Sequence, residues 1–155
     1  MFVSERPDLA EAGRALLYQF GVGLAFLGTV RADGGPSLHP FCPLLEGDGI
    51  YAFLTPSPKR HDLKRDGRYA MHSFPADADE DAFYLTGTAR ADPDEQLRDR
   101  LTVRFAAERP QLDAIDLDQH EVFEFLIERC LLTRTSVHGD ASPRHEVWRA
   151  QGIGS

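Results

Sequence analysis

Residues 24–55 read LAFLGTVRADGGPSLHPFCPLLEGDGIYAFLT, and this stretch decides the predicted fold. Its mostly apolar runs are separated by two turn sequences, ADGGP at 32–36 and EGDG at 46–49. Asp-Gly and the neighbouring glycines supply the positive φ angles that tight hairpin turns need. The stretch therefore predicts an antiparallel meander of three strands, over residues 24–30, 37–45 and 50–55.

On both sides of this meander, the spacing of apolar residues predicts helices over 8–20, 58–65 and 92–109, and strands over 69–74, 83–91, 121–137 and 144–150. Asp92 is the expected N-cap of the third helix, with Pro93 in its first turn. Gly87, inside a strand, indicates a bulge or a close backbone approach. The strands follow one another in hairpins rather than in βαβ units. The sequence thus predicts one mainly β domain over 1–155, an antiparallel barrel with two or three helices packed outside.

The charge balance restricts the possible partners. The chain has 17 Lys and Arg residues against 25 Asp and Glu residues, a net charge of −8. Nucleic acids and anionic membranes bind clustered Lys and Arg, so neither is expected as a partner. No stretch has the pattern of a signal peptide or of a membrane helix, which indicates a cytoplasmic protein. The two cysteines, Cys42 and Cys130, lie in no CxxC motif and are expected to be reduced.

Most motifs that carry chemistry are absent from the sequence. There is no GxSxG, HExxH, paired CxxC or P-loop, and the six histidines show no metal-ligand spacing, so we predict no metal site. Residues 21–26 begin like a dinucleotide-binding fingerprint but precede a strand, so we reject that interpretation. Two histidines, His39 and His72, fall in predicted strands where a side chain can face a cofactor.

The one local basic cluster is SPKRHDLKR at 57–65. It follows a strand and opens a helix, and a helix N-terminus offers unpaired N–H groups and the positive end of the dipole. Lys59, Arg60 and the Ser57 hydroxyl add charge and hydrogen-bonding capacity for a phosphate. The alternative is a solvated basic helix that pairs with the acidic surface.

The order of these segments resembles the pyridoxamine 5′-phosphate oxidase-like, FMN-binding split-barrel family. The resemblance covers about residues 8–150 and rests on four stretches in the right order: GTVRADGGPSLHP (28–40), YAFLT with KRHDLKRD (51–66), LTGTAR (85–90) and EVWR (146–149). It implies an antiparallel, Greek-key-like split β-barrel. It also implies a homodimer with FMN bound at the subunit interface.

The resemblance also implies which residues hold the cofactor. Lys59 matches the family's phosphate-binding lysine, and Ser57 and Arg60 are the expected supporting contacts. Thr55 ends the strand beneath the phosphate. The remaining expected contacts, on the two strands beside the flavin ring, are Thr29, His39, Pro40 and Phe41.

Three departures from the family pattern bear on function. Gly35 stands where many relatives have Arg. Asp62 stands where Asn is usual, and its charge weakens phosphate binding unless Lys59 or Arg60 neutralises it. The ending WRAQG at 148–152 lacks the longer Arg- and Pro-containing terminus of true pyridoxamine phosphate oxidases. We therefore do not expect pyridoxamine phosphate as the substrate.

These observations leave several functions open. The first is an FMN-dependent oxidoreductase of unknown substrate, for which no catalytic residue can be assigned because the flavin carries the electron chemistry. A close variant uses the deazaflavin F420, held by the same basic turn. A binding protein for haem or flavin without turnover is the alternative, with His39, His72 or His138 as axial ligand of a haem. Loss of cofactor binding through Asp62 is a further hypothesis.

Overall fold

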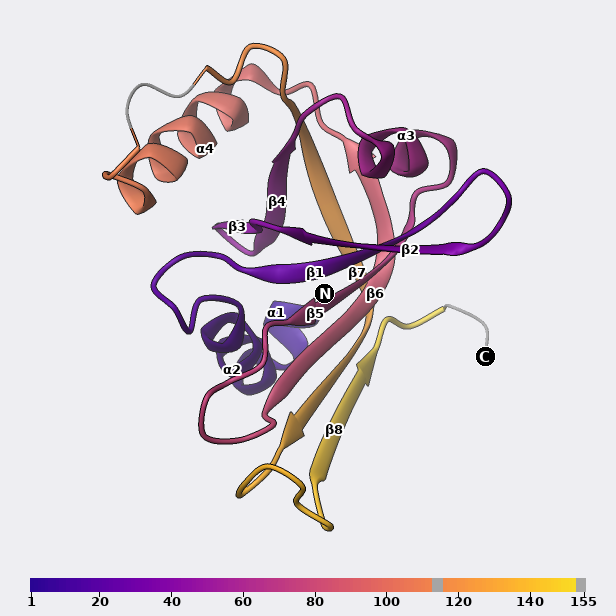
Figure 1. Ribbon diagram of the computed structural model, residues 1–155, viewed down its shortest axis with the longest axis vertical. Helices are drawn as coiled ribbons and strands as arrows, with labels where there is room; N and C mark the ends of the chain where they lie inside the picture. The colour runs from indigo at the N-terminus through magenta and orange to yellow at the C-terminus, as the bar shows by residue number, and fades with distance from the viewer. Residues whose placement is uncertain (113–115, 153–155) are drawn as a thin grey trace.

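A computed structural model describes residues 1–112 and 116–152 (Figure 1). This part of the chain contains eight strands and four helices. In order they are α1 (Phe2–Glu5), α2 (Pro7–Leu17), β1 (Ala25–Val30), β2 (Pro36–Phe41), β3 (Leu44–Glu46), β4 (Gly49–Leu54), α3 (Pro58–Arg65), β5 (Arg68–Ser73), β6 (Ala82–Ala91), α4 (Glu95–Glu108), β7 (Glu121–Arg134) and β8 (Arg144–Arg149).

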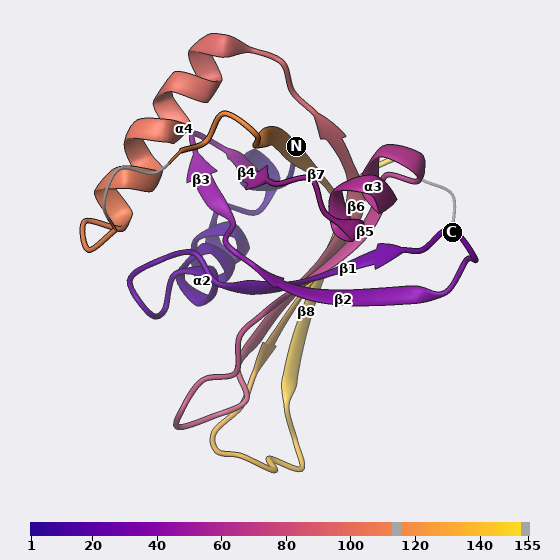
Figure 2. The ribbon, with the colours of Figure 1, turned by 45° about the horizontal axis from the view of Figure 1, so that its top comes forward.

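All strands belong to one sheet in the order β2-β1-β5-β6-β7-β4-β3, with β8 added on β7, and every pairing is antiparallel. The two ends of this order, β2 and β3, are neighbours in the chain and are separated only by residues 42 and 43. The sheet must therefore curl until its ends meet. Figure 2 shows this curled sheet, with α4 beside β3 and β4. The predicted split β-barrel with outer helices is confirmed.

The predicted second strand, 37–45, is interrupted at Cys42–Pro43, which is why the barrel has one strand more than the sequence predicts. Pro43 has no N–H for a sheet ladder. Its carbonyl accepts a hydrogen bond from the Tyr18 hydroxyl at 3.2 Å. That carbonyl also approaches Gly23 so closely that a Cβ there would lie 1.8 Å from its oxygen. The chain bends here and changes partner from β1 to β4, so the predicted meander is correct only for its two turns.

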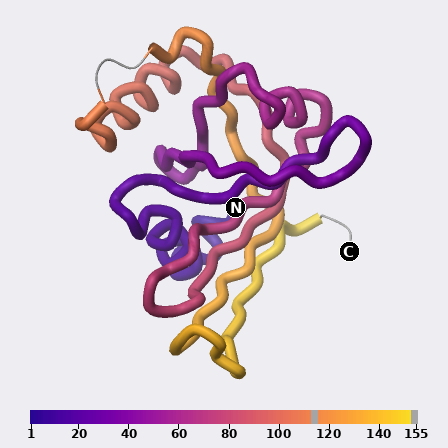
Figure 3. The backbone as a smooth tube through the Cα atoms, viewed as in Figure 1, coloured from indigo at the N-terminus to yellow at the C-terminus, as the bar shows by residue number. Residues whose placement is uncertain are grey.

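The bulge predicted at Gly87 is confirmed. The register between β6 and β7 shifts between Thr86 and Gly87. A Cβ at Gly87 would lie 1.8 Å from the carbonyl oxygen of Leu126 on the neighbouring strand, so only glycine fits at this position. Beyond the bulge, β6, β7 and β8 continue together toward the end of the molecule opposite α3 (Figure 3).

Two predicted helix boundaries are wrong. The helix predicted over 8–20 runs from Pro7 to Leu17, with the one-turn α1 before it. The third helix begins at Glu95, because Asp94 rather than Asp92 is its N-cap and accepts hydrogen bonds from the N–H groups of residues 96 and 97. Asp92 instead accepts from the N–H of Asp94, which closes a turn ahead of the helix. The prediction for α3, 58–65, is correct.

The core fills the barrel interior. Its fully buried side chains include Leu27, Met71, Phe83, Leu85 and Phe123, and a second cluster under α4 contains Leu44, Leu97, Leu101 and Val122. Both cysteines are free thiols; Cys130 is buried, and burial raises its pKa to about 11. Within the described residues, no helix has the length and apolar character required to cross a membrane.

Candidate cofactor-binding site

The N-terminal end of α3 has an open first turn. Strand β4 ends at Leu54, and the helix begins at Pro58 with Ser57 as the N-cap residue. The Ser57 hydroxyl donates to the carbonyl of Thr55 at 2.9 Å, and no side chain caps the helix. The first-turn N–H groups and the positive end of the helix dipole therefore remain available to an anion.

The four cations of α3 differ in their bonding. Arg60 and Lys64 both pair with Glu121, at 2.9 Å and 2.5 Å, and Arg65 pairs with an aspartate on its own helix at 2.9 Å. Lys59 has no ion pair or side-chain hydrogen bond with any residue that the structure describes. It is half-buried beside the open first turn. Of the four cations, Lys59 is thus the one available to a phosphate.

Arg60 fastens the end of β4 to the beginning of β7. Its guanidinium donates to the carbonyls of Leu54 at 3.3 Å and Gln119 at 2.9 Å, in addition to its ion pair with Glu121. Its side chain is only 16% exposed. These contacts occupy both terminal nitrogens of Arg60. Its role is therefore structural: it joins β4 to β7 beside the predicted phosphate site.

Asp62 is buried between α3 and β1. The Thr29 hydroxyl donates to one carboxylate oxygen at 2.8 Å, and Arg65 donates to the other at 2.9 Å. Burial raises the pKa of Asp62, but the hydrogen bonds from Arg65 and Thr29 outweigh it and hold the pKa below its ordinary value. The charge of Asp62 is therefore neutralised by Arg65, and neither Lys59 nor Arg60 is used for this purpose.

His39 lies next to this network. Its Nε2 is 3.1 Å from the Ser37 hydroxyl and 3.5 Å from the Thr29 hydroxyl. Burial lowers the pKa of His39, and the charge of Lys59 lowers it further, whereas Asp62 acts in the opposite direction. The lowered pKa favours the neutral form of the His39 imidazole, close to the ammonium group of Lys59. The structure thus brings together His39, Thr29 and Lys59, three of the predicted site residues.

The other predicted contacts lie apart from this cluster. Phe41 is buried, and its ring packs against Phe125 with 5.6 Å between centroids. Pro40 is exposed on the opposite face of β2, since β2 alternates between inward and outward side chains. Thr55 is exposed at the end of β4. Within one chain, then, Thr29 and His39 lie together, whereas Pro40 and Phe41, also predicted beside a flavin ring, do not join them.

The outward face of the sheet carries a row of side chains that sequence reasoning missed. Cross-strand partners face the same side of a sheet, and the register aligns one such set across six strands. We call this set the outer row: Pro40, Phe26, His72, Tyr84, Leu131 and Val147. Leu38, two residues before Pro40, extends it and is 70% exposed. The sequence could not predict this set, because the alignment of its residues depends on the order of the strands in the sheet.

Two further histidines were haem-ligand candidates. His72 is exposed in the outer row, and its Nδ1 lies 2.6 Å from the carbonyl of Ser73. His138 is exposed in the β7–β8 turn, with Nε2 2.9 Å from the carbonyl of Asp77. Among the described residues, no three His, Cys, Asp or Glu side chains gather in a metal-binding group.

No known protein-family model matches this sequence, and no curated protein matches it. Several solved structures, however, match the fold of this chain. A putative pyridoxamine 5′-phosphate oxidase from Listeria innocua superposes with a TM-score of 0.66 and 18% identity, over 80% of this chain and 97% of that one. The general stress protein 26 from Bacillus anthracis superposes with a TM-score of 0.65 and 16% identity, over 92% and 98%. A heme binding protein from Mycobacterium smegmatis superposes with a TM-score of 0.66 and 16% identity, over 89% of this chain but 57% of that one.

These likenesses confirm the predicted fold. The chain has the split β-barrel fold of the pyridoxamine 5′-phosphate oxidase-like proteins. Proteins of one fold perform many functions, so the function must be argued from the site.

Proposed function

We propose that this protein binds FMN, with the phosphate at the N-terminal end of α3, and acts as a flavin-dependent oxidoreductase. The observation that carries the proposal is Lys59, the available cation of α3, beside an uncapped first turn. The donor set fits a phosphate: one ammonium group, free backbone N–H groups and a nearby neutral histidine. Bound FMN supplies the electron-transfer chemistry.

The chain's own residues have separate roles in this proposal. Lys59 and the first-turn N–H groups bind the phosphate. Arg60 holds β4 and β7 in place beneath the helix, and Asp62 holds the helix against β1 through Thr29. Because Arg65 already neutralises Asp62, its charge opposes phosphate binding less than the sequence suggests. F420 carries a phosphate as well and is a variant of the same proposal.

We further propose that a second copy of the chain covers the outer row and completes the flavin site. One chain does not gather the residues predicted for the ring, and the outer row presents apolar or aromatic side chains on five of its six strands, with His72 on the sixth. Leu38→Glu should convert a dimer to a monomer in light scattering. Val103→Glu, at an equally exposed position on α4 (71% against 70%), should leave the dimer intact. A monomeric wild type would contradict this part of the proposal.

The test of FMN binding is an absorption and fluorescence titration of the purified protein with FMN and, separately, with F420. Lys59→Ala should raise the dissociation constant for FMN about 10- to 100-fold, because one charge-assisted hydrogen bond is worth about 1.5–3 kcal/mol. Lys64→Ala is the matched control. It removes the same charge from the same helix, but from a lysine already paired with Glu121. Equal affinity in the two variants would remove the basis for the phosphate site.

A second candidate function, haem binding, is favoured by one observation at His72. The carbonyl of Ser73 holds its Nδ1, which leaves Nε2 directed away from the backbone as a potential axial ligand. One of the structures of similar fold is a heme binding protein from Mycobacterium smegmatis. If the protein binds haem in this way, His72→Ala should abolish the haem absorption band, whereas His138→Ala should not.

A further inference from the structure

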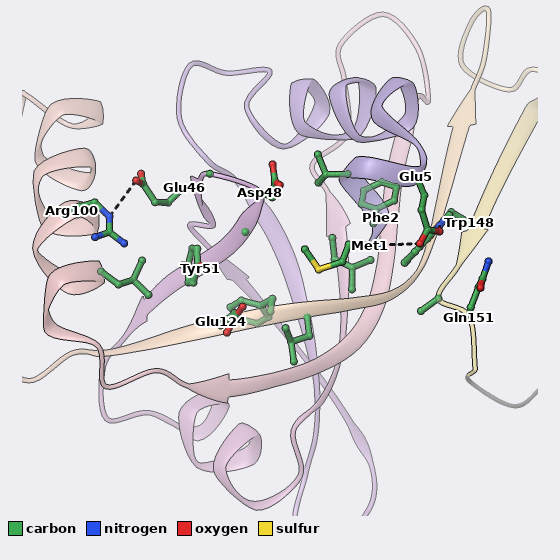
Figure 4. A pocket seen from close by; sticks show the side chains of 18 residues that line it. Met1, Phe2, Glu5, Glu46, Asp48, Tyr51, Arg100, Glu124, Trp148 and Gln151 are labelled. Atoms are coloured by element: carbon green, nitrogen blue, oxygen red, sulfur yellow. Dashed lines mark hydrogen bonds and ion pairs between the residues drawn. The ribbon is translucent and has the colours of Figure 1, made fainter.

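A groove of about 700 Å³ lies on the side of the barrel where β4 begins. It is bounded by α1, the turn between β3 and β4, the first half of α4, the middle of β7 and the end of β8. Figure 4 shows Arg100 and Glu46 at one end, Trp148 and Glu5 at the other, and Tyr51 and Glu124 between them. Its volume is within the range of small-molecule sites, about 300–1,000 Å³.

The groove is separate from the α3 site. It begins at Gly49, the first residue of β4, whereas α3 follows the last residue of the same strand. Five residue steps separate Gly49 from Leu54, so at about 3.3 Å per residue these two ends of β4 are about 17 Å apart. None of the residues that line the groove is a predicted cofactor contact. An inference about the groove therefore does not rest on the proposed function.

Four aromatic residues line the groove, Phe2, Tyr51, Phe125 and Trp148. Tyr51 is the half-buried one, whereas the other three are less than 9% exposed. The Tyr51 ring lies so close to Gly49 that a Cβ at that position would come within 2.5 Å of it. The Tyr51 hydroxyl makes no hydrogen bond with any residue that the structure describes. The ring faces of Tyr and Trp attract cations through their quadrupoles.

Carboxylates dominate the rim. Four acidic side chains line the groove, Glu5, Glu46, Asp48 and Glu124, against two cations, Arg100 and the N-terminal ammonium group of Met1, which pairs with Glu5 at 2.7 Å. Glu46 is shared by Arg100 and Arg104, and Glu124 pairs with Arg90 outside the groove. Asp48 is exposed and has no ion pair within the described residues.

The pKa of Tyr51 agrees with a negative potential in the groove. Burial raises this pKa, and the neighbouring carboxylates of Glu124 and Asp92 raise it further. Aromatic walls under an acidic rim are complementary to a positively charged ligand with an apolar body.

We propose that this groove is a binding site for a small organic cation, a protonated or quaternary amine that carries an aromatic group. The ammonium group lies at the acidic rim near Asp48 and Glu124. The apolar body packs against Tyr51, and Trp148 lies at the other end of the groove (Figure 4). Anions are repelled by the same carboxylates, and a neutral analogue lacks the electrostatic and cation–π contributions.

The chain carries its own reporter for this site. Trp148 is the single tryptophan of the sequence, and it lines the groove. Its fluorescence should change saturably when benzyltrimethylammonium is added to the full-length protein. Benzyl alcohol, a neutral probe, and benzenesulfonate, an anionic one, should bind at least about tenfold more weakly, the ratio that corresponds to about 1.4 kcal/mol.

Asp48→Asn should weaken benzyltrimethylammonium binding roughly three- to tenfold, the effect of one partly screened charge at close range. The matched control is Asp77→Asn, which neutralises an exposed aspartate in the β5–β6 turn, outside the groove, and should leave binding unchanged. Three outcomes would overturn the proposal. They are equal affinity for the neutral probe, equal effects of the two substitutions, and a Trp148 signal that responds to protein concentration but not to the cation. The last would show that a second copy of the chain covers the groove.

Discussion

The barrel-facing side of α3 and its N-terminal end contain the same kinds of charged side chain in different bonding states. On the barrel-facing side, Arg60 donates to the carbonyls of Leu54 and Gln119, and Asp62 accepts from Thr29 on β1 and from Arg65 on its own helix. At the N-terminal end, Lys59 makes none to the described residues. Two neighbouring cations, Lys59 and Arg60, are thus equivalent in sequence but not in the structure. One helix thus uses some of its charged side chains for stability and leaves another available to a ligand. Substitutions at four positions test this division.

The largest effect is expected at Asp62. Asp62→Ala leaves the buried Thr29 hydroxyl without its carboxylate acceptor and leaves Arg65 with only its hydrogen bond to the carbonyl of Val30. It should lower the free energy of unfolding by about 2–3 kcal/mol. This loss of free energy is smaller than the loss expected for a fully buried ion pair, because Arg65 is 42% exposed and water can hydrate its guanidinium in the variant. Denaturant unfolding measures the loss, with Asp77→Ala as the control. A loss as small as that of the control would mean that Asp62 does not hold α3 to β1.

A smaller effect is expected at Arg60. Arg60→Ala removes the hydrogen bonds to Leu54 and Gln119 and the ion pair with Glu121, and should cost about 2 kcal/mol. Lys59→Ala should change the free energy of unfolding by no more than about 0.5 kcal/mol, as a surface substitution does. Thermal unfolding separates the two variants, since about 1 kcal/mol shifts the melting temperature by roughly 2–4 °C in a chain of this size. Equal shifts would invalidate the division between the two cations.

Thr29→Val keeps the side-chain shape and removes one hydrogen bond to Asp62, so it should cost about 1 kcal/mol. A double-mutant cycle with Asp62→Ala measures the interaction itself. If the two losses simply add, the contact between Thr29 and Asp62 contributes nothing to stability.

The smallest effect is the acid dependence of stability. The folded pKa of Asp62 lies below its ordinary value of 3.8, so the unfolded chain takes up this proton at a higher pH than the folded one. The contribution of Asp62 is complete above pH 3.8 and is lost as the pH falls through the folded pKa. The difference in unfolding free energy between the wild type and Asp62→Asn should therefore be smaller at pH 3 than at pH 6, with the change confined to pH values below about 3.8. A constant difference over this range would show that the charge of Asp62 does not contribute.

Local signals predicted much of the fold. Ser57-Pro58 and Asp66-Gly67 act on their own neighbours, and the bounds of α3 are correct for that reason. Gly87 was identified as a bulge because a glycine inside a strand is informative by itself. The break at Pro43 was missed, since it depends on Gly23 and Tyr18, which come from earlier in the chain.

In the candidate site, too, the sequence predicted features that depend on neighbouring residues and missed those that depend on distant ones. The basic turn at 57–65 is visible in the sequence, and so is the spacing of three residues that lets Arg65 reach Asp62 on a helix. That Glu121 binds two of the four cations is not visible, because 57 residues separate it from Lys64. The groove was not predicted either, since its walls come from α1, β4, β7 and β8.

The sequence by itself determined the strand-rich architecture, the hairpin turns and the position of the basic helix. These depend on side-chain periodicity and on the φ angles of a few glycines and prolines, which act over a few residues. The tertiary structure alone decided which cation is available, which face of the sheet carries the outer row, and where the groove with its carboxylates lies. The physical reason is that ion pairs, burial and cavities depend on which distant segments the curled sheet brings within a few ångströms of one another.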